Sequence, residues 1–194
     1  VLRSTVPHAY IKRLDYSKAL ALPGVACVLT SKDVPGNNRI GIIIKDEPCL
    51  VDDKIRRVGD AIALVAADTP ERVQEALDLI EIEYDLIEPV LTFERAMEED
   101  SPKVHGTTNV HGKKHLEIGD VDAAFKMCDV IVEHTYNTSM LSHMFIEPEA
   151  GVALYENDIL TVYCSTQNPH YDRSDVARVM GLPNNKVRIV QVAT

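Results

Sequence analysis

The sequence predicts an α+β fold for this chain of 194 residues. Short apolar or alternating runs, which favour strands, outnumber helical patterns in the first hundred residues, and the second half mixes the same two kinds of pattern. Hydrophobic residues make up 45% of the chain and charged residues 26%, which is ordinary for a globular protein and argues against disorder.

Strands are the main elements predicted in the first half of the chain. The strongest pattern is Ile55–Ala67, which contains the apolar residues Val58, Ile62, Leu64 and Val65. The segment Glu47–Asp53 is polar and predicts a loop. The other predicted strands are His8–Asp15, Val25–Thr30, Ile40–Ile44 and Glu81–Asp85.

Two helices are predicted between these strands. Ser17 is a suitable N-cap for a short helix that stops at Pro23-Gly24. Thr69 is the expected N-cap of a longer helix, and Pro70 suits its first position. Apolar residues then recur at helical spacing: Val73, Ala76, Leu77 and Ile80.

The best candidate for a domain boundary is Glu98–Lys114, which combines acidic residues with proline and glycine. We expect the change of domain between Asp100 and His115. Beyond it, helices are predicted at Val121–Met127 and from Asn168-Pro169 to Gly181. Strands are predicted at Val130–Ser139, Gly151–Tyr155, Leu160–Ser165 and Val187–Val192.

The charge and the hydropathy of the chain disfavour several classes of function. Thirty acidic and twenty basic side chains give a net charge of −10, which opposes nonspecific binding to nucleic acid or to an anionic membrane. No apolar run approaches the roughly 20 residues that span a bilayer. We therefore expect a cytoplasmic protein. Because the chain starts at Val1 and ends in a strand pattern, we also expect it to be a piece of a longer polypeptide.

Cysteine and histidine do not form a convincing metal-site pattern. The four cysteines contain no C-x-x-C pair and are expected to be buried thiols. His111 and His115 have ligand-like spacing, but two lysines lie between them, so solvated histidines are favoured. His143 and Glu147 share this spacing around an apolar centre, where a structural carboxylate is favoured over a functional one.

The most suggestive polar string is Ser165–His170, which follows a predicted buried strand and precedes a helix N-terminus. Such a place can hold a ligand, although a simple capped loop is the favoured alternative. The sequence contains no G-x-S-x-G, G-x-G-x-x-G or G-x-x-x-x-G-K-[ST] string, so neither serine or cysteine hydrolase chemistry nor phosphate binding is indicated.

Several short strings, in this order, resemble the xanthine dehydrogenase and aldehyde oxidase family. Its a/b hammerhead domain is matched by Pro7-His8-Ala9, Asp15–Ala19, Pro23-Gly24-Val25, Asp33–Gly36 and Val58-Gly59-Asp60. Its molybdopterin-binding domain is matched by Gly119–Phe125, His143–Pro148 and Ser165–Pro169. The resemblance implies a hammerhead domain at residues 1–105, followed at 106–194 by the first part of a mixed α+β molybdopterin-binding domain.

The resemblance also implies a function. The parent protein would be a molybdenum hydroxylase with a molybdenum-molybdopterin cofactor, acting on purines, heteroaromatic rings or aldehydes. Iron-sulfur clusters and a flavin on partner chains or domains would receive the electrons. Gln167 matches the position whose amide is expected to donate to an apical oxo ligand of molybdenum. No catalytic residue or metal ligand is expected within these 194 residues, so the isolated chain should be inactive and without cofactor.

Two other classes of function stay open at this point. A non-catalytic assembly or interaction module could keep the hammerhead fold without the chemistry. A metallohydrolase could use His111, His115 and His134 as zinc ligands, and it predicts bound zinc in the purified chain.

Overall fold

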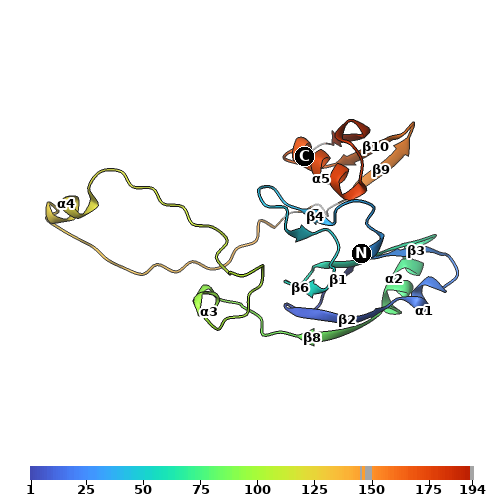
Figure 1. The fold of residues 1–194 in the computed structure, drawn as a ribbon, viewed down its shortest axis with the longest axis horizontal. Helices are drawn as coiled ribbons and strands as arrows, with labels where there is room; N and C mark the ends of the chain where they lie inside the picture. Colours follow the sequence, from blue (N-terminus) through green and yellow to red (C-terminus); the bar gives the residue numbers. More distant parts are fainter. Residues whose placement is uncertain (145, 147–149, 193–194) are drawn as a thin grey trace. The chain divides into compact units, whose positions relative to one another are not determined.

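A computed structural model describes residues 1–144, 146 and 150–192 (Figure 1). The chain divides into two compact units, of which the first comprises Val1–Asn109 together with Glu149–Thr194 and the second comprises Val110–Pro148. The predicted α+β class is confirmed, because short sheets and short helices make up both halves of the first unit. Within the described residues, no helix is long and apolar enough to cross a membrane.

The first sheet of this unit has the order β6-β2-β8 and is antiparallel. Its central strand is β2 (Ala9–Asp15), which pairs with β6 (Lys54–Ile55) and β8 (Glu81–Leu86). Alternate residues of β8 face the core and the solvent, as the two-residue period predicted. The buried residues of this core are Val51, Ile55 and Ile62.

The second sheet has the order β1-β7-β3, with β7 (Ala61–Ala67) between β1 (Leu2–Arg3) and β3 (Val25–Leu29). The helices α1 (Ser17–Leu20) and α2 (Pro70–Asp78) pack against this sheet, as Figure 1 shows. Small side chains let the helices approach the strands closely, and the buried residues of this core are Ala19, Val28, Ala63 and Ala76.

The third sheet has the order β11-β10-β9 and carries the candidate site. The antiparallel hairpin of β9 (Gly151–Glu156) and β10 (Ile159–Cys164) turns at two residues with positive φ, Asn157 and Asp158. A crossover through α5 (Pro169–Met180) then leads to β11 (Val187–Gln191), which is parallel to β10. The buried residues between α5 and the sheet are Leu160, Ala177 and Val187.

The remaining elements are short. They are the strand pair β4 (Arg39–Ile40) and β5 (Glu47–Pro48), the helix α3 (Phe93–Met97), and the 3₁₀ turns η1 (Ser31–Asp33) and η2 (Asn184–Lys186). The sequence reasoning did not predict α3, which is little longer than one turn. Its N-cap Thr92 accepts a hydrogen bond from the Arg95 backbone N–H. The sequence signal for this helix was therefore its capping residue alone, because the segment has no apolar period.

The predicted ends of the two longer helices are confirmed. The Thr69 hydroxyl accepts a hydrogen bond from the Arg72 backbone N–H at the start of α2, with Pro70 in the first helical position. At the start of α5, the Asn168 side chain caps the Tyr171 N–H. Gly181 ends α5 with φ +65°, a conformation that glycine adopts without strain.

The first helix begins differently from the prediction. Ser17 is the first helical residue of α1 rather than its cap, and its backbone N–H and its hydroxyl both donate to Oδ1 of Asp15. The carboxylate therefore performs the capping role that the sequence reasoning assigned to the serine.

The prediction of one long strand over Ile55–Ala67 is wrong. The segment forms the end of β6 and the whole of β7, with a tight turn between them. In this turn the Asp60 carboxylate accepts hydrogen bonds from the backbone N–H groups of Arg56 and Arg57, and Gly59 adopts φ +93°. A short polar side chain that bonds its own backbone competes with the strand ladder, so the apolar pattern was interrupted.

The predicted strand Ile40–Ile44 is also wrong for most of its length. The strand ends at Ile40, and Gly41 adopts φ +142°, after which the isoleucine side chains are largely exposed. Branched side chains alone do not make a strand, because the backbone also needs a neighbouring strand to pair with. That neighbour is β5, which lies inside the segment predicted as a loop.

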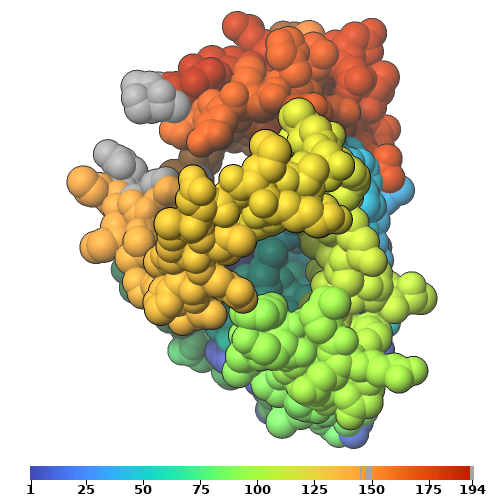
Figure 2. All heavy atoms as spheres, turned by 90° about the vertical axis from the view of Figure 1, so that its left-hand side faces the viewer, coloured from blue at the N-terminus to red at the C-terminus, as the bar shows by residue number. Residues whose placement is uncertain are grey.

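The second unit contains α4 (Val121–Lys126), which confirms the helix predicted at Val121–Met127. The Asp120 carboxylate caps this helix by accepting from the Ala123 N–H. The strand predicted at Val130–Ser139 is not present, and the described backbone on both sides of α4 runs without helix or strand. In Figure 1 these yellow-green to orange residues form narrow extended stretches, and in Figure 2 their atoms form a curved band. Alternating apolar residues are present, but no described strand pairs with them.

Candidate functional site

The candidate site is the loop between β10 and α5, which contains Gln167. Strand β10 ends at Cys164, and α5 begins at Pro169. The Gln167 side chain is exposed, and its amide makes no hydrogen bond to any of the described residues. A neutral group with two N–H donors is therefore free to meet a ligand here.

The residues on either side of Gln167 are held by hydrogen bonds. The Thr166 hydroxyl accepts from the Asn168 backbone N–H at 3.0 Å and donates to the Asp172 carboxylate in the first turns of α5. The Asn168 side chain in turn accepts from the Tyr171 N–H at 3.3 Å. The exposed amide thus projects from a backbone that is fixed before and after it.

Burial and charge act on the strand that leads into this loop. Burial raises the pKa of the Cys164 thiol, and the nearby Asp172 carboxylate raises it further. Cys164 therefore stays protonated at neutral pH, and its exposure is only partial. A neutral thiol adds no negative charge beside Gln167.

A second set of contacts holds the far end of α5. The backbone N–H groups of Gly36 and Asn37 donate to the carbonyls of Val179 and Arg178 at 2.8 and 2.9 Å. The Lys45 ammonium forms an ion pair of 2.5 Å with Asp175, in which both side chains are mostly buried. The sequence reasoning missed these contacts, because they join residues that lie far apart in the chain.

The histidines of the metallohydrolase hypothesis are not brought together in the described structure. The His115 ring nitrogen Nε2 lies 3.1 Å from a Glu117 carboxylate oxygen, and the His134 ring contacts the edge of Tyr136 at 5.0 Å between centroids. His111 is exposed. Across the described ranges, no group of three or more His, Cys, Asp or Glu side chains has an arrangement that could hold a metal ion.

Two other sequence predictions have different outcomes. All four cysteines are free thiols; Cys27, Cys49 and Cys164 are partly buried, whereas Cys128 is exposed, so the prediction of burial is wrong for Cys128. This cysteine follows α4 in the second unit, where none of the described residues is buried. The prediction for His143 and Glu147 cannot be placed, because Glu147 lies outside the described residues.

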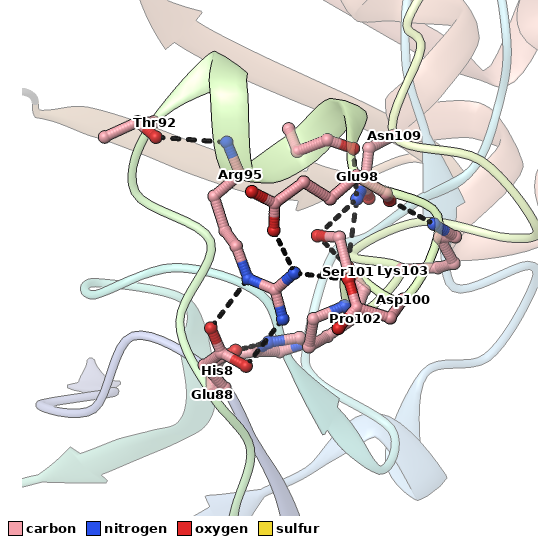
Figure 3. Close-up of polar contacts among 11 residues, drawn as sticks. His8, Glu88, Thr92, Arg95, Glu98, Asp100, Ser101, Pro102, Lys103 and Asn109 are labelled. Atoms are coloured by element: carbon pink, nitrogen blue, oxygen red, sulfur yellow. Dashed lines mark hydrogen bonds and ion pairs between the residues drawn. The ribbon is translucent and has the colours of Figure 1, made fainter.

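The densest polar cluster of the described chain surrounds Arg95 (Figure 3). Its guanidinium binds both carboxylate oxygens of Glu88, at 2.8 and 2.9 Å, and also pairs with Glu98 and Asp100. The hydrogen bonds from Arg95 lower the pKa values of Glu88 and Asp100, and the carboxylates raise the pKa of Arg95. Because these groups satisfy one another, we interpret the cluster as structural.

Two more side chains in Figure 3 form hydrogen bonds with the segment that contains Arg95 and its partners. The buried His8 ring donates through Nδ1 to the Glu88 carbonyl at 3.0 Å. The Asn109 amide donates to the carbonyls of Ala96 and Pro102, and its oxygen accepts from the Val104 N–H. These contacts anchor the segment that follows β8.

Comparison with known proteins identifies both halves of the chain. Residues 1–88 match the family model of the aldehyde oxidase and xanthine dehydrogenase a/b hammerhead domain. Residues 103–194 match the model of the molybdopterin cofactor-binding domain. The second match contains Gln167 and the loop around it.

Relatives of the whole chain are found among dehydrogenase subunits. It is 66% identical, over its full length, to 46% of the nicotinate dehydrogenase large molybdopterin subunit of Eubacterium barkeri. It is 42% identical, over 98% of its length, to 26% of a probable xanthine dehydrogenase subunit of Bacillus subtilis. The chain thus spans less than half the length of these relatives.

Solved structures of similar proteins share the fold. The aldehyde oxidoreductase of Desulfovibrio gigas superposes with a TM-score of 0.90 at 31% identity, over 98% of this chain and 22% of that one. Quinoline 2-oxidoreductase of Pseudomonas putida 86 gives a TM-score of 0.82 at 27% identity, over 100% of this chain and 26% of that one. The chain belongs to the xanthine dehydrogenase and aldehyde oxidase family.

Proposed function

We propose that this chain is the part of a molybdenum hydroxylase that presents the Gln167 amide to an oxo ligand of the molybdenum-molybdopterin cofactor. One observation carries the proposal: the amide is exposed and unpartnered among the described residues, while the backbone on both sides of it is hydrogen-bonded. Donors that are fixed before the reaction stabilise developing negative charge without reorganisation.

The residues of this loop fit such a group. An oxo ligand accepts hydrogen bonds, and Gln167 offers a neutral donor, whereas a carboxylate in its place would be repelled. The neighbouring Asp172 carboxylate is occupied by the Thr166 hydroxyl. Of the described residues, Gln167 is the one that we assign to the cofactor, and we assign no acid or base to the chain.

The cofactor, when bound, supplies the redox chemistry of the hydroxylation, in which a carbon–hydrogen bond is replaced by a carbon–oxygen bond with oxygen from water. The reaction R–H + H₂O → R–OH + 2H⁺ + 2e⁻ is balanced only if an acceptor removes two electrons. Iron-sulfur clusters and a flavin on partner subunits or domains are the acceptors that we propose. Both bacterial relatives are named as subunits, which supports an assembly of several parts.

For the substrate, we propose a nitrogen heteroaromatic ring, with nicotinate as the first compound to test. The support is the 66% identity to a nicotinate dehydrogenase subunit, against 42% to the probable xanthine dehydrogenase subunit. Purines and aldehydes are the alternative substrate classes.

We also propose a cytoplasmic enzyme, since all four cysteines are free thiols, as is usual in a reducing compartment.

The test of the proposal is the reduction of the assembled enzyme by nicotinate, measured in single turnovers at matched molybdenum content. Removing one preorganised donor costs about 2 to 4 kcal/mol, so Gln167→Ala should slow reduction by roughly 30-fold to 1,000-fold. Gln167→Glu should be at least as slow, because it replaces a neutral donor with an anion.

The matched control is Gln74→Ala, which removes the same side chain from the exposed face of α2, where among the described residues it bonds only to Asp78. This variant should reduce at the wild-type rate. Wild-type rates in both Gln167 variants would overturn the role of Gln167. An assembled protein that binds no molybdenum would instead support the non-catalytic module. Reduction by xanthine or an aldehyde but not by nicotinate would change the substrate class and leave the role of Gln167 in place.

A further inference from the structure

We propose that Thr166 and Asp172 are positioning residues for the Gln167 amide, a role that rests on the proposed function of Gln167. Neither side chain would touch the cofactor. Together they would hold the backbone from which the amide projects, so that the donor reaches its acceptor in one orientation.

The Thr166 hydroxyl takes part in two hydrogen bonds. It accepts from the Asn168 backbone N–H and donates to the Asp172 carboxylate, so one oxygen atom links the two sides of the loop. The residue between the two bonded positions is Gln167. A hydroxyl is suited to this use because it has one donor and two acceptor positions.

Asp172 connects this hydroxyl to α5. It lies in the first turn of α5, where a carboxylate interacts favourably with the positive end of the helix dipole. Besides burial, the negative charge of Asp172 also raises the pKa of the Cys164 thiol at the end of β10. Asp172 therefore joins the helix to the loop and lies close to the end of the strand, and these are the elements that flank Gln167.

The Thr166–Asp172 hydrogen bond, which we call the clamp, differs from the other contacts of α5. Asp175, in the next turn, pairs with Lys45 and accepts from the Gly41 N–H, so it serves the docking of α5. Asn168 caps the helix through the Tyr171 N–H. Among the described contacts, only the Thr166–Asp172 bond connects the residue before Gln167 directly to the helix after it.

The experiment uses the assembled, cofactor-loaded enzyme with Thr166→Val, which keeps the shape of the side chain and removes the hydroxyl. Small misplacements of a positioned group cost up to about 100-fold in rate. We expect Thr166→Val to lower kcat by about 10-fold to 100-fold with little change in KM. Thr166→Ser, which keeps the hydroxyl, should recover most of the rate. Asp172→Ala should resemble Thr166→Val, and Asp172→Asn, which keeps an acceptor oxygen, should be milder.

The second readout does not depend on activity. Hydrogen–deuterium exchange of the peptide that contains Asn168 should accelerate in Thr166→Val and Asp172→Ala, because the Asn168 amide loses its acceptor or that acceptor loses its anchor. Ser174→Ala is the control, since Ser174 lies exposed on α5 and outside the clamp. It should leave both exchange and rate unchanged.

A double mutant distinguishes positioning from a general structural effect. If Thr166 acts through Gln167, adding Thr166→Val to Gln167→Ala should slow the enzyme no further. An equal slowing in both backgrounds would overturn the proposal, as would a Thr166→Val enzyme with wild-type rate and exchange or one that loses its molybdenum. A Gln167→Ala enzyme with the wild-type rate would instead show that the proposed function has failed.

Discussion

The backbone N–H of Gly36 donates a hydrogen bond of 2.8 Å to the carbonyl of Val179, close to the C-terminal end of α5. The last carbonyls of a helix have no partner within it, so a neighbouring loop that donates N–H groups acts as a cap. Residues matched by the hammerhead model thus satisfy a helix that belongs to the molybdopterin-binding match. The helix they cap is the one that begins directly after the Gln167 loop.

Substitution of Gly36 should therefore destabilise the chain. A Cβ atom at Gly36 would lie 2.5 Å from the Gly181 nitrogen and still closer to the Arg178 carbonyl oxygen, and both are backbone atoms that cannot turn away. We expect Gly36→Ala to lower the free energy of unfolding by about 1 to 3 kcal/mol, measured by urea denaturation. Gly112→Ala is the control, because a Cβ there meets nothing within 4 Å. Equal stability of the two variants would contradict the capping role of the Gly36 loop.

The Arg95 cluster predicts a pH-dependent contribution to stability. The pKa values of Glu88 and Asp100 are lowered from their ordinary values of 4.5 and 3.8, chiefly by hydrogen bonds from Arg95. A carboxyl group with a lowered folded-state pKa stabilises the fold above its unfolded pKa, and this contribution is lost as the pH falls through the folded value. Arg95→Gln should therefore lower the urea midpoint at pH 7.

The difference between wild type and Arg95→Gln should shrink as the pH falls below about 4, where the carboxylates become protonated. It should also shrink in high salt, because these groups are exposed to solvent. Arg72→Gln is the control, since within the described part of the chain Arg72 has only one ion pair, with Glu75 on the same helix. A difference that stays constant from pH 7 to pH 3 would mean that Arg95 stabilises the chain by packing instead.

The cysteines should differ in their reactivity toward iodoacetamide. Cys128 is exposed, whereas burial raises the pKa values of Cys49 and Cys164 and so lowers their thiolate fractions at pH 8. We expect mass spectrometry of the 194-residue chain to find Cys128 alkylated first. Cys128→Ser should remove the fast phase and leave the slow one. Faster labelling of Cys49 would show that its surroundings open readily.

The domain division predicted at residues 105 and 106 can be tested with trypsin. Lys113 and Lys114 are exposed and lie in the predicted boundary region outside any helix or strand. We expect the first cleavage of the 194-residue chain at this pair. A Lys113→Gln, Lys114→Gln double variant should lose that early fragment. A first cut inside β7 or α2 would contradict the division.

The local signals of this sequence determined many of its elements. Thr69-Pro70 and Asn168-Pro169 start helices because their side chains and ring geometry satisfy the first turn without help from elsewhere. Gly181 ends α5 for a similarly local reason, since it tolerates a positive φ. The loop that contains Gln167 was identifiable for the same reason, because it follows a strand pattern and precedes a strong helix start.

Tertiary structure decided which apolar runs became strands and what each loop contacts. Ile42 to Ile44 and Val130 to Ser139 have strand-like side chains, but a strand forms only where a second strand supplies hydrogen bonds, and in the described residues none pairs with them. The contacts of Gly36 with Val179 and of Lys45 with Asp175 join residues far apart in the chain, so no local pattern predicts them. Local conformational preferences act over a few residues, whereas pairing and docking depend on which segments the fold brings together.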